Sequence, residues 1–427
     1  MSSGPARTRL PDRFAVRLSL RTHLCNDGKA LVGGANGSLL HLRGAAVGRV
    51  SSGQPLDAGD PVGSTLCRLL LDRGFADPWW PSGAGADEGV TDVTVVVPVL
   101  DRPEPLARLL EALPAQVPVI VVDDGSRSPA ALADVARRYG ARLVVHEHNR
   151  GPAAARNTGL RQVATSYVVF CDSDVTPVAG WLAELRRQFQ DPAVGVAGPR
   201  VHGREPQPSD GWLDRYEQAR SSLDLGAVPA MVRPGGVVSY LPGACLMARV
   251  EALGGGFDES LRVAEDVDLI WRVVRDGWRV RYAPASVVRH DHRTRLAPWL
   301  ARKAFYGTGA ALLAQRHGEA VAPMVLAPWS AVLVAALLAQ RRASVPVATA
   351  TLAITGARIA LRLHEHEHPL RAAALLTAQG AQATLHQTSS ALTRHYWPVA
   401  AALALRSSRA RRALLVAAVV EGLVDRR

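Results

Sequence analysis

The stretch Val168–Val175 ends a β-branched and aromatic run in two aspartates, Asp172 and Asp174, one residue apart. Aspartate is a poor strand residue, so the pair is expected in the turn that directly follows a buried strand. Such a turn presents carboxylate oxygens, which are the ligands that Mg²⁺ and Mn²⁺ prefer. The pair therefore predicts a divalent metal held against a nucleotide diphosphate. The alternative is a solvated turn without a ligand.

Further carboxylates follow two other predicted strands. Asp101 comes shortly after 93–97, and Asp123 and Asp124 come directly after 117–122. Ligands of open α/β sheets bind beyond the carboxyl ends of the parallel strands. We therefore expect these side chains and the Asp-x-Asp turn on one rim of a single sheet.

The elements that position this rim alternate regularly along the chain. This alternation is typical of βαβ units and predicts a doubly wound, mostly parallel α/β sheet. Strands are predicted at 93–97, 117–122, 142–146 and 167–171, and helices at 103–113, 130–139 and 153–163. A helix at 180–189 and strands at 193–201 and 241–249 follow.

The sequence lacks the glycine-rich phosphate loops Gly-x-Gly-x-x-Gly and Gly-x-x-x-x-Gly-Lys-Ser/Thr. A dinucleotide dehydrogenase or a P-loop enzyme is therefore not indicated. Acids repel phosphate unless a divalent metal bridges the two, and other carboxylates suit the N–H groups of a base and the ribose hydroxyls. Arg156 and Asn157 open a predicted helix, where they can donate to a diphosphate.

An acidic pair, Glu265 and Asp266, begins a later helix with an apolar face. Acids in a first helical turn are favoured electrostatically by about 0.3–1 kcal/mol, which by itself explains the pair. The alternative is catalytic: transfer of a group to a hydroxyl needs a carboxylate that takes the proton from that hydroxyl.

Four motifs resemble, in order and spacing, the successive signatures of the family 2 glycosyltransferases, which have a GT-A fold. They are Pro98-Val-Leu-Asp-Arg, Val122-Asp-Asp-Gly-Ser, Asn149-Arg-Gly-Pro-Ala-Ala-Ala-Arg-Asn-Thr-Gly-Leu and Asp172-Ser-Asp. The resemblance implies that Pro98, Asp101, Asp123 and Asp124 cradle the base and ribose of a UDP-sugar. It also implies that Asp172 lies over the ribose and metal and that Asp174 binds the metal. Many members have Tyr-Asn where this chain has Leu100-Asp101, so the role of Asp101 stays open.

The resemblance continues in the second half of the predicted domain. Family members have an acidic pair at the position of Glu265 and Asp266, which implies that Asp266 is the general base, that the anomeric carbon is inverted and that Glu265 positions the acceptor. His290 resembles a histidine that in some members reaches the metal or diphosphate, and the alternative is a surface histidine. The Gln-x-x-Arg-Trp element of processive synthases is missing, and the nearest stretch is 299–307. This argues against a long-chain synthase.

The N-terminal residues 1–81 predict a small module with a β-hairpin and two helices. Its strands are expected at 30–34 and 38–42 around Asn36-Gly37, and its helices at 43–51 and 64–73. The module is either a winged-helix-like, peptide-chaperone-like domain that binds a peptide or pathway protein, or a structural cap on the next domain. The remaining chain divides into a flexible linker (82–90), the GT-A domain (91–318) and a helical C-terminal region (319–427).

The C-terminal region is basic and apolar. The part from Arg289 onward holds 18 Lys and Arg against 6 Asp and Glu, so it carries the whole net charge of +12. This favours an anionic membrane surface over nucleic acid, for which no binding motif is present. The apolar runs 320–339 and 343–357 are either membrane spans (or a re-entrant hairpin) or packed and interfacial helices.

Other features bear on the location of the protein. The four cysteines form no Cys-x-x-Cys pair and the first ten residues contain no apolar signal-peptide core, so we expect a reducing cytoplasm and no signal peptide. With the basic tail, this predicts a cytoplasmic protein at the inner face of the cell membrane. The run His364-Glu-His-Glu-His is either a metal site or a solvated turn.

The whole layout resembles the glycosyltransferases of mycofactocin systems, a branch of family 2. That resemblance implies UDP-glucose as donor, a peptide-derived redox cofactor precursor as acceptor and a short β-linked oligoglucoside as product. Three alternatives stay open: a glycosyltransferase for a lipid or cell-wall acceptor, a nucleotidyltransferase with a similar metal site, and a peptide-binding scaffold without activity.

Overall fold

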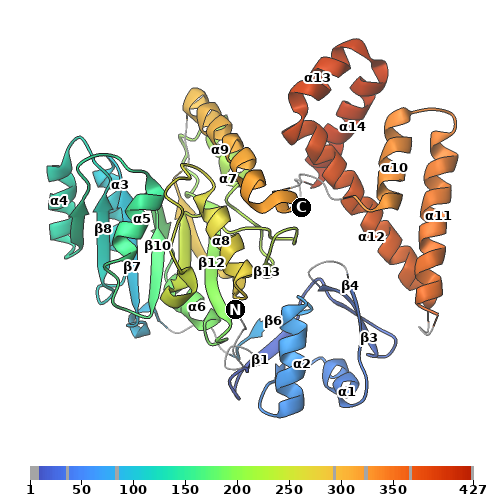
Figure 1. Cartoon of the computed structure of the whole chain (residues 1–427), viewed down its shortest axis with the longest axis horizontal. Coiled ribbons are helices and arrows are strands. Elements are labelled where there is room, and N and C mark those ends of the chain that lie inside the picture. The colour runs from blue at the N-terminus through green and yellow to red at the C-terminus, as the bar shows by residue number, and fades with distance from the viewer. Residues whose placement is uncertain are drawn as a thin grey trace. The chain divides into compact units, whose positions relative to one another are not determined.

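The structure, a computed structural model, describes residues 9–34, 38–81, 86–291, 295–321, 326–364 and 368–424. The chain forms two compact units (Figure 1). The first unit comprises Met1–Leu24 and Gly28–Ala320, and the second comprises Cys25–Asp27 and Val321–Arg427.

The first unit is built on a mixed sheet with nine strands among the described residues. Its order is β11-β15-β12-β14-β10-β7-β8-β9, and β13 pairs with β15. The strands are β7 (Val93–Val99), β8 (Val119–Asp123), β9 (Arg142–Val145), β10 (Tyr167–Cys171), β11 (Val175–Pro177), β12 (Val194–Gly203), β13 (Ala230–Val232), β14 (Cys245–Arg249) and β15 (Arg279–His290). The predicted α/β alternation is confirmed, since β7, β8, β9 and β10 pair in parallel.

The sheet is less parallel than predicted in its second half. β14 runs antiparallel to both β10 and β12, and β11 runs antiparallel to β15. A single strand pattern does not reveal the direction of its partner, and β11 has only three residues. The carboxyl ends of β10 and β7 still meet at one rim, as the topology rule requires.

Helices cover the sheet and fix its loops. In α3, α4 and α5 a proline occupies the first turn, where its missing N–H leaves no helical bond unmade. These helices are α3 (Pro103–Ala112), α4 (Pro129–Arg138), α5 (Pro152–Leu160), α6 (Trp181–Gln188), α7 (Trp212–Arg220), α8 (Glu265–Arg275) and α9 (Leu296–His317). In α5, a Cβ on Gly159 would lie 2.3 Å from a methyl carbon of Val96, so the glycine lets this helix pack directly on β7.

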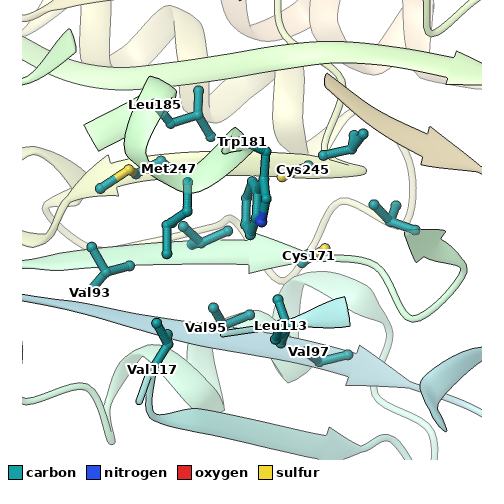
Figure 2. Packing of buried hydrophobic residues seen from close by; sticks show 14 of the residues in the cluster. Val93, Val95, Val97, Leu113, Val117, Cys171, Trp181, Leu185, Cys245 and Met247 are labelled. Atoms are coloured by element: carbon teal, nitrogen blue, oxygen red, sulfur yellow. The ribbon is translucent and has the colours of Figure 1, made fainter. Parts of the chain in front are cut away.

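The core explains why the strands have continuous apolar runs. β7 and β10 are buried along their length and are covered on both faces, as expected of parallel strands. Figure 2 shows Trp181 and Leu185 from α6 together with Met247 and Cys171 from the sheet, within one cluster of buried side chains. Fully burying each large side chain of this cluster contributes about 1.5–3 kcal/mol to folding.

The N-terminal module contains more β-structure than predicted. The hairpin strands β3 (Ala30–Gly33) and β4 (Ser38–His41) and the helices α1 (Ala45–Ser51) and α2 (Pro61–Asp72) are confirmed, while the turn Asn36-Gly37 lies outside the described residues. A second sheet was not predicted, because its strands have only two to four residues. Its order is β5 (Leu56–Asp57), β1 (Ala15–Leu18), β6 (Ala76–Trp79), and β2 (His23–Cys25) joins the hairpin.

The module is fixed to the part of the unit that contains the nine-stranded sheet by a buried ion pair. The guanidinium of Arg68 on α2 donates to both carboxylate oxygens of Asp191, at 2.8 and 2.9 Å. Asp191 is completely buried and Arg68 is only 9% exposed. Beside this pair, Arg279 at the start of β15 donates to Asp72 at 2.6 Å. The module and the sheet therefore belong to one compact unit.

The flexible linker predicted over 82–90 is wrong at its C-terminal end. Asp87–Gly89 form a 3-10 helix, and the buried Asp87 carboxylate accepts from the backbone N–H groups of Gly180 and Ala183, both at 2.9 Å. Small and acidic residues suggested flexibility, but these bonds to the start of α6 hold the segment in place. Residues 82–85 lie outside the described part of the chain.

The second unit is helical, as predicted. It consists of α10 (Pro328–Ala339), α11 (Ser344–Arg362), α12 (Pro369–Ser390), α13 (Trp397–Arg406) and α14 (Ser408–Val424). The helix within the first predicted span, α10, has only 12 residues, about 18 Å in length, and is too short to cross a bilayer. Among the described residues, α11 alone is long and apolar enough, with 19 residues and none of them buried. The run His364–His368 lies mostly outside the described residues.

Candidate active site

The predicted metal-binding residues converge at the end of β10. Asp174 lies in the turn after this strand, and its Oδ1 is 3.5 Å from Nε2 of His290 at the end of β15. The two meet because β11, directly after Asp174, pairs with the last residues of β15. The other oxygen of Asp174 accepts from Arg102, which precedes α3. Arg102 was not singled out in the sequence, and its position directly after Asp101 was the only signal.

Asp172 belongs to the same group of charges. Burial raises the pKa of Asp172, the charge of Arg156 lowers it, and the charge of Asp174 raises it again, for a net increase. Among the described residues no three His, Cys, Asp or Glu side chains form a closed metal site. Asp172 and Asp174 supply two carboxylates at this point, and Mg²⁺ or Mn²⁺ in a nucleotide site takes one or two carboxylates from the protein and oxygens from substrate phosphates.

A buried arginine connects the two halves of the site. Arg156 on α5 donates to Oδ1 of Asp172 at 2.7 Å and to Oε1 of Glu265 at 2.8 Å. Burial lowers its pKa, but the charges of these two carboxylates outweigh burial and raise the pKa overall. The guanidinium therefore faces carboxylates from the end of β10 and the start of α8. Its neighbour Asn157, expected to donate to a diphosphate, instead exchanges hydrogen bonds with the backbone of Phe257 at 2.8 and 2.9 Å.

Asp266 is held in one orientation by backbone N–H groups. Its Oδ2 accepts from Gly243 at 2.6 Å, and its Oδ1 accepts from Val267 at 2.8 Å. A Cβ on Gly243 would lie 3.1 Å from Oδ2, so only glycine allows this close approach without displacement. Ala264, the residue two positions before Asp266 at the start of α8, has φ of 63°, a strained conformation that a non-glycine residue adopts only where its surroundings enforce it.

The environment of Asp266 makes it more basic than an ordinary aspartate. Burial raises its pKa, the charge of Glu265 adds to this, and the hydrogen bond from Gly243 opposes both, with a resulting pKa of about 6. A carboxylate with this pKa is ionised at neutral pH and accepts a proton more readily than an exposed one. The arrangement is chemically suited to a general base.

The two adjacent aspartates after β8 are used differently. Asp124 accepts from the backbone N–H groups of Arg150 and Gly151, at 2.9 and 2.8 Å, and contacts Nδ1 of His146 at 2.8 Å. Both its oxygens therefore hold the turn before α5. Asp123 accepts from Ser126 through Oδ1, whereas its buried Oδ2 has no partner among the described residues. This oxygen is free to accept from an N–H group of a ligand.

Two further predicted residues line the same rim. Pro98 lies on β7 beside Val122 of β8. Asp101 has φ of 55° and accepts from the backbone N–H of Arg127 at 2.8 Å, while its own N–H donates to Ser126 at 2.8 Å. The loop after β7 is thereby joined to the loop that contains Asp123. The structure therefore brings all the predicted site residues to one end of the sheet.

Comparison with known proteins agrees with these motifs. The family described as glycosyl transferase family 2 matches residues 94–256. Two curated proteins from strains of Mycobacterium tuberculosis, both named pre-mycofactocin glycosyltransferase, are 44% identical over 430 residues, covering 98% of this chain and 88% of theirs. An N-acetylglucosaminyl-diphospho-decaprenol L-rhamnosyltransferase of the same species is 29% identical and covers 53% of this chain and 86% of its own.

Among solved structures, the chain is similar to a mannosyltransferase from Pyrobaculum calidifontis in complex with GDP-Man and Mn²⁺. It is 22% identical, covers 82% of this chain and 92% of its own, and has a TM-score of 0.41. The match to the family and the 44% identity with named glycosyltransferases over 98% of the chain show which family the chain belongs to. The chain belongs to glycosyltransferase family 2 and is a sugar-transferring enzyme.

Proposed function

We propose that the protein transfers glucose from UDP-glucose to a peptide-derived redox cofactor precursor of the mycofactocin type. We further propose that the anomeric carbon is inverted and that a short β-linked oligoglucoside is built. The acceptor rests on one observation: 44% identity over 98% of the chain with pre-mycofactocin glycosyltransferase. This likeness includes the N-terminal module and the C-terminal helices, whereas the rhamnosyltransferase covers only 53% of the chain.

The donor would lie along the rim of the sheet. The free Oδ2 of Asp123 suits an N–H group of a uracil base, and Asp101 borders the same loop. Asp172, Asp174 and His290 would hold the divalent metal, which when bound neutralises the charge that develops on the leaving diphosphate. Arg156 keeps Asp172 oriented through its 2.7 Å hydrogen bond.

The transfer step would use the carboxylate of Asp266. As the acceptor hydroxyl oxygen bonds to the anomeric carbon, the bond from that carbon to the diphosphate oxygen breaks and UDP leaves. The hydroxyl proton passes to Asp266, whose orientation is fixed by Gly243 and Val267. A single displacement of this kind inverts the anomeric configuration. Glu265, paired with Arg156, is a positioning residue beside the base.

The acceptor is tested by incubating the protein with UDP-glucose, Mn²⁺ and cell extracts with or without the peptide-derived precursor. Mass spectrometry is expected to show products one or more hexoses heavier only when the precursor is present. Hexose gained only by lipid would contradict the acceptor and favour the alternative, a membrane-associated glycosyltransferase for a lipid or cell-wall acceptor. The observation that favours this alternative is α11, a 19-residue apolar helix without a buried residue.

We propose that the protein is associated with a membrane, whichever of the two acceptors it uses. α11 is about 28 Å long, close to the thickness of the hydrocarbon core, and it follows Arg341 and Arg342. Basic flanks are typical of the cytoplasmic side, and this supports a location of the catalytic unit at the inner face. Sedimentation with vesicles that contain anionic lipids tests this: the full chain is expected to sediment with them, and a chain that stays in the supernatant contradicts it.

The N-terminal module is proposed to act as a cap on the catalytic domain. The buried bidentate pair of Arg68 with Asp191 supports this interpretation over a mobile domain that delivers a peptide or pathway protein. Family membership also answers two of the alternatives raised by the sequence. A nucleotidyltransferase and a scaffold without activity are both inconsistent with it.

A further inference from the structure

One face of helix α9 lies against the start of α8, beside the candidate active site. Its buried residues are Gly309 and Leu313, and Tyr306 and Arg302 precede them at intervals of three and four residues. Side chains at this spacing lie on one face of a helix. Gly309 and Leu313 therefore share one face of α9 with Tyr306 and Arg302. This face is buried in the C-terminal half of the helix and less buried in the N-terminal half.

A close contact locates this face. A Cβ on Gly309 would lie 3.0 Å from Cβ of Ala264, the residue that directly precedes Glu265. The helix therefore crosses the N-terminus of α8, where the predicted general base is held. Tyr306 is one turn away from this crossing point.

Both ends of α9 are anchored, so its position over the site is fixed. Near its C-terminus, Nε2 of His317 is 2.8 Å from Oδ1 of Asp268 on α8. Near its N-terminus, the indole N–H of Trp299 donates to Glu217 on α7 at 2.7 Å. The middle of the helix spans the region between these two anchors.

Tyr306 lies within the field of the catalytic carboxylates. Burial raises its pKa, Arg302 lowers it, and the charges of Asp172 and Asp266 raise it further. Tyr306 is nevertheless 46% exposed, so part of the ring is available to a ligand. Arg302 donates through Nε to the Tyr306 hydroxyl at 2.9 Å, and its guanidinium carbon lies 4.8 Å from the ring centroid.

We propose that Tyr306 and Arg302 form the subsite for an acceptor sugar, and so determine how far the oligoglucoside is extended. A glucose ring has C–H faces that pack on an aromatic ring, and hydroxyls that accept from guanidinium N–H groups. A sugar therefore matches both groups of this subsite, the aromatic ring of Tyr306 and the guanidinium of Arg302. This inference rests on the proposed function, since it concerns the second and later glucose additions.

The test uses the full chain, UDP-glucose, Mn²⁺ and methyl β-glucoside as a simple acceptor, with glucose transfer followed by mass spectrometry. Tyr306→Ala is expected to raise the KM for the glucoside about tenfold, because the aromatic contact is lost. The KM for UDP-glucose is expected to stay unchanged. Tyr306→Phe retains the ring and is expected to behave nearly as the original protein, whereas Arg302→Gln is expected to raise the same KM.

Leu300→Ala is the control, because Leu300 is an apolar residue of the same helix, 52% exposed, on a different face from Tyr306 and Arg302. It is expected to leave both KM values unchanged. The inference is overturned if Tyr306→Ala extends the glucoside normally, or if Leu300→Ala impairs extension equally. It is also overturned if the original protein cannot glucosylate methyl β-glucoside. Failure of the proposed function differs from these results: the peptide-derived precursor then gains no hexose, while the glucoside still does.

Discussion

The pKa of Asp266 leads to a quantitative expectation for the pH dependence of transfer. With a pKa of about 6, this carboxylate is about nine-tenths ionised at about pH 7 and about one-tenth ionised at about pH 5. If the ionised form is the general base, kcat/KM for the acceptor falls about tenfold between those two values. An aspartate with the ordinary pKa of 3.8 would stay ionised throughout, so the rate would change little.

Two neighbouring variants should move the pH profile in opposite directions. Glu265→Gln removes a negative charge that raises the pKa of Asp266, so the acidic limb is expected at lower pH. Arg156→Met removes a positive charge that lowers this pKa, so the limb is expected at higher pH. Asp266→Asn should lower the rate about 10²–10⁴-fold, which is the usual contribution of a general base.

The assay is release of UDP at limiting acceptor and saturating UDP-glucose, measured at closely spaced pH values. Circular dichroism at each pH serves as the control, because acid unfolding would also lower the rate. A rate that is constant down to about pH 5 would refute the assignment of Asp266, as would shifts of the same sign in both neighbouring variants.

Three other perturbations have defined outcomes. Asp191→Asn breaks the buried ion pair with α2 and is expected to destabilise the protein by about 3–5 kcal/mol in urea unfolding, whereas Asp134→Asn in an exposed pair should cost less than about 1 kcal/mol. Equal effects would exclude the proposed cap. Gly243→Ala places a methyl group 3.1 Å from Oδ2 of Asp266, so kcat is expected to fall while UDP binding, measured by calorimetry, stays unchanged. Chelation with EDTA should stop transfer and added Mn²⁺ should restore it, with Asp174→Asn needing more Mn²⁺; full activity in EDTA would contradict a metal site.

Local patterns were sufficient to predict the first half of the catalytic domain. The apolar runs of β7, β8 and β10 are long, the helices α3, α4 and α5 begin with proline, and the carboxylates lie at or shortly after the ends of the strands. The strands of the second N-terminal sheet have only two to four residues. Pairing with residues far away in the chain decides whether such short strands form, so their local sequence does not predict them. The direction of β14 is a similar case, since its partners are distant in the chain.

The identities of the site residues were easier to predict than their contacts. Arg156 and Glu265 are 109 residues apart, and nothing local to either indicates their hydrogen bond. Asp123 and Asp124 look equivalent in the sequence, yet Asp124 is used to hold the turn before α5 and Asp123 retains a free oxygen. Tyr306 was not predicted because α9 is apolar and basic, a composition that does not indicate that the helix crosses an active site.

The most direct test of the transfer chemistry is the anomeric configuration of the product, determined by NMR on the acceptor after reaction with UDP-glucose. A single displacement, with Asp266 accepting the hydroxyl proton, predicts that the α-linked glucose of the donor becomes β-linked in the product. It also predicts that Asp266→Asn forms little of that product. An α-linked product would contradict the proposed mechanism, because retention requires a second displacement or a different reaction path.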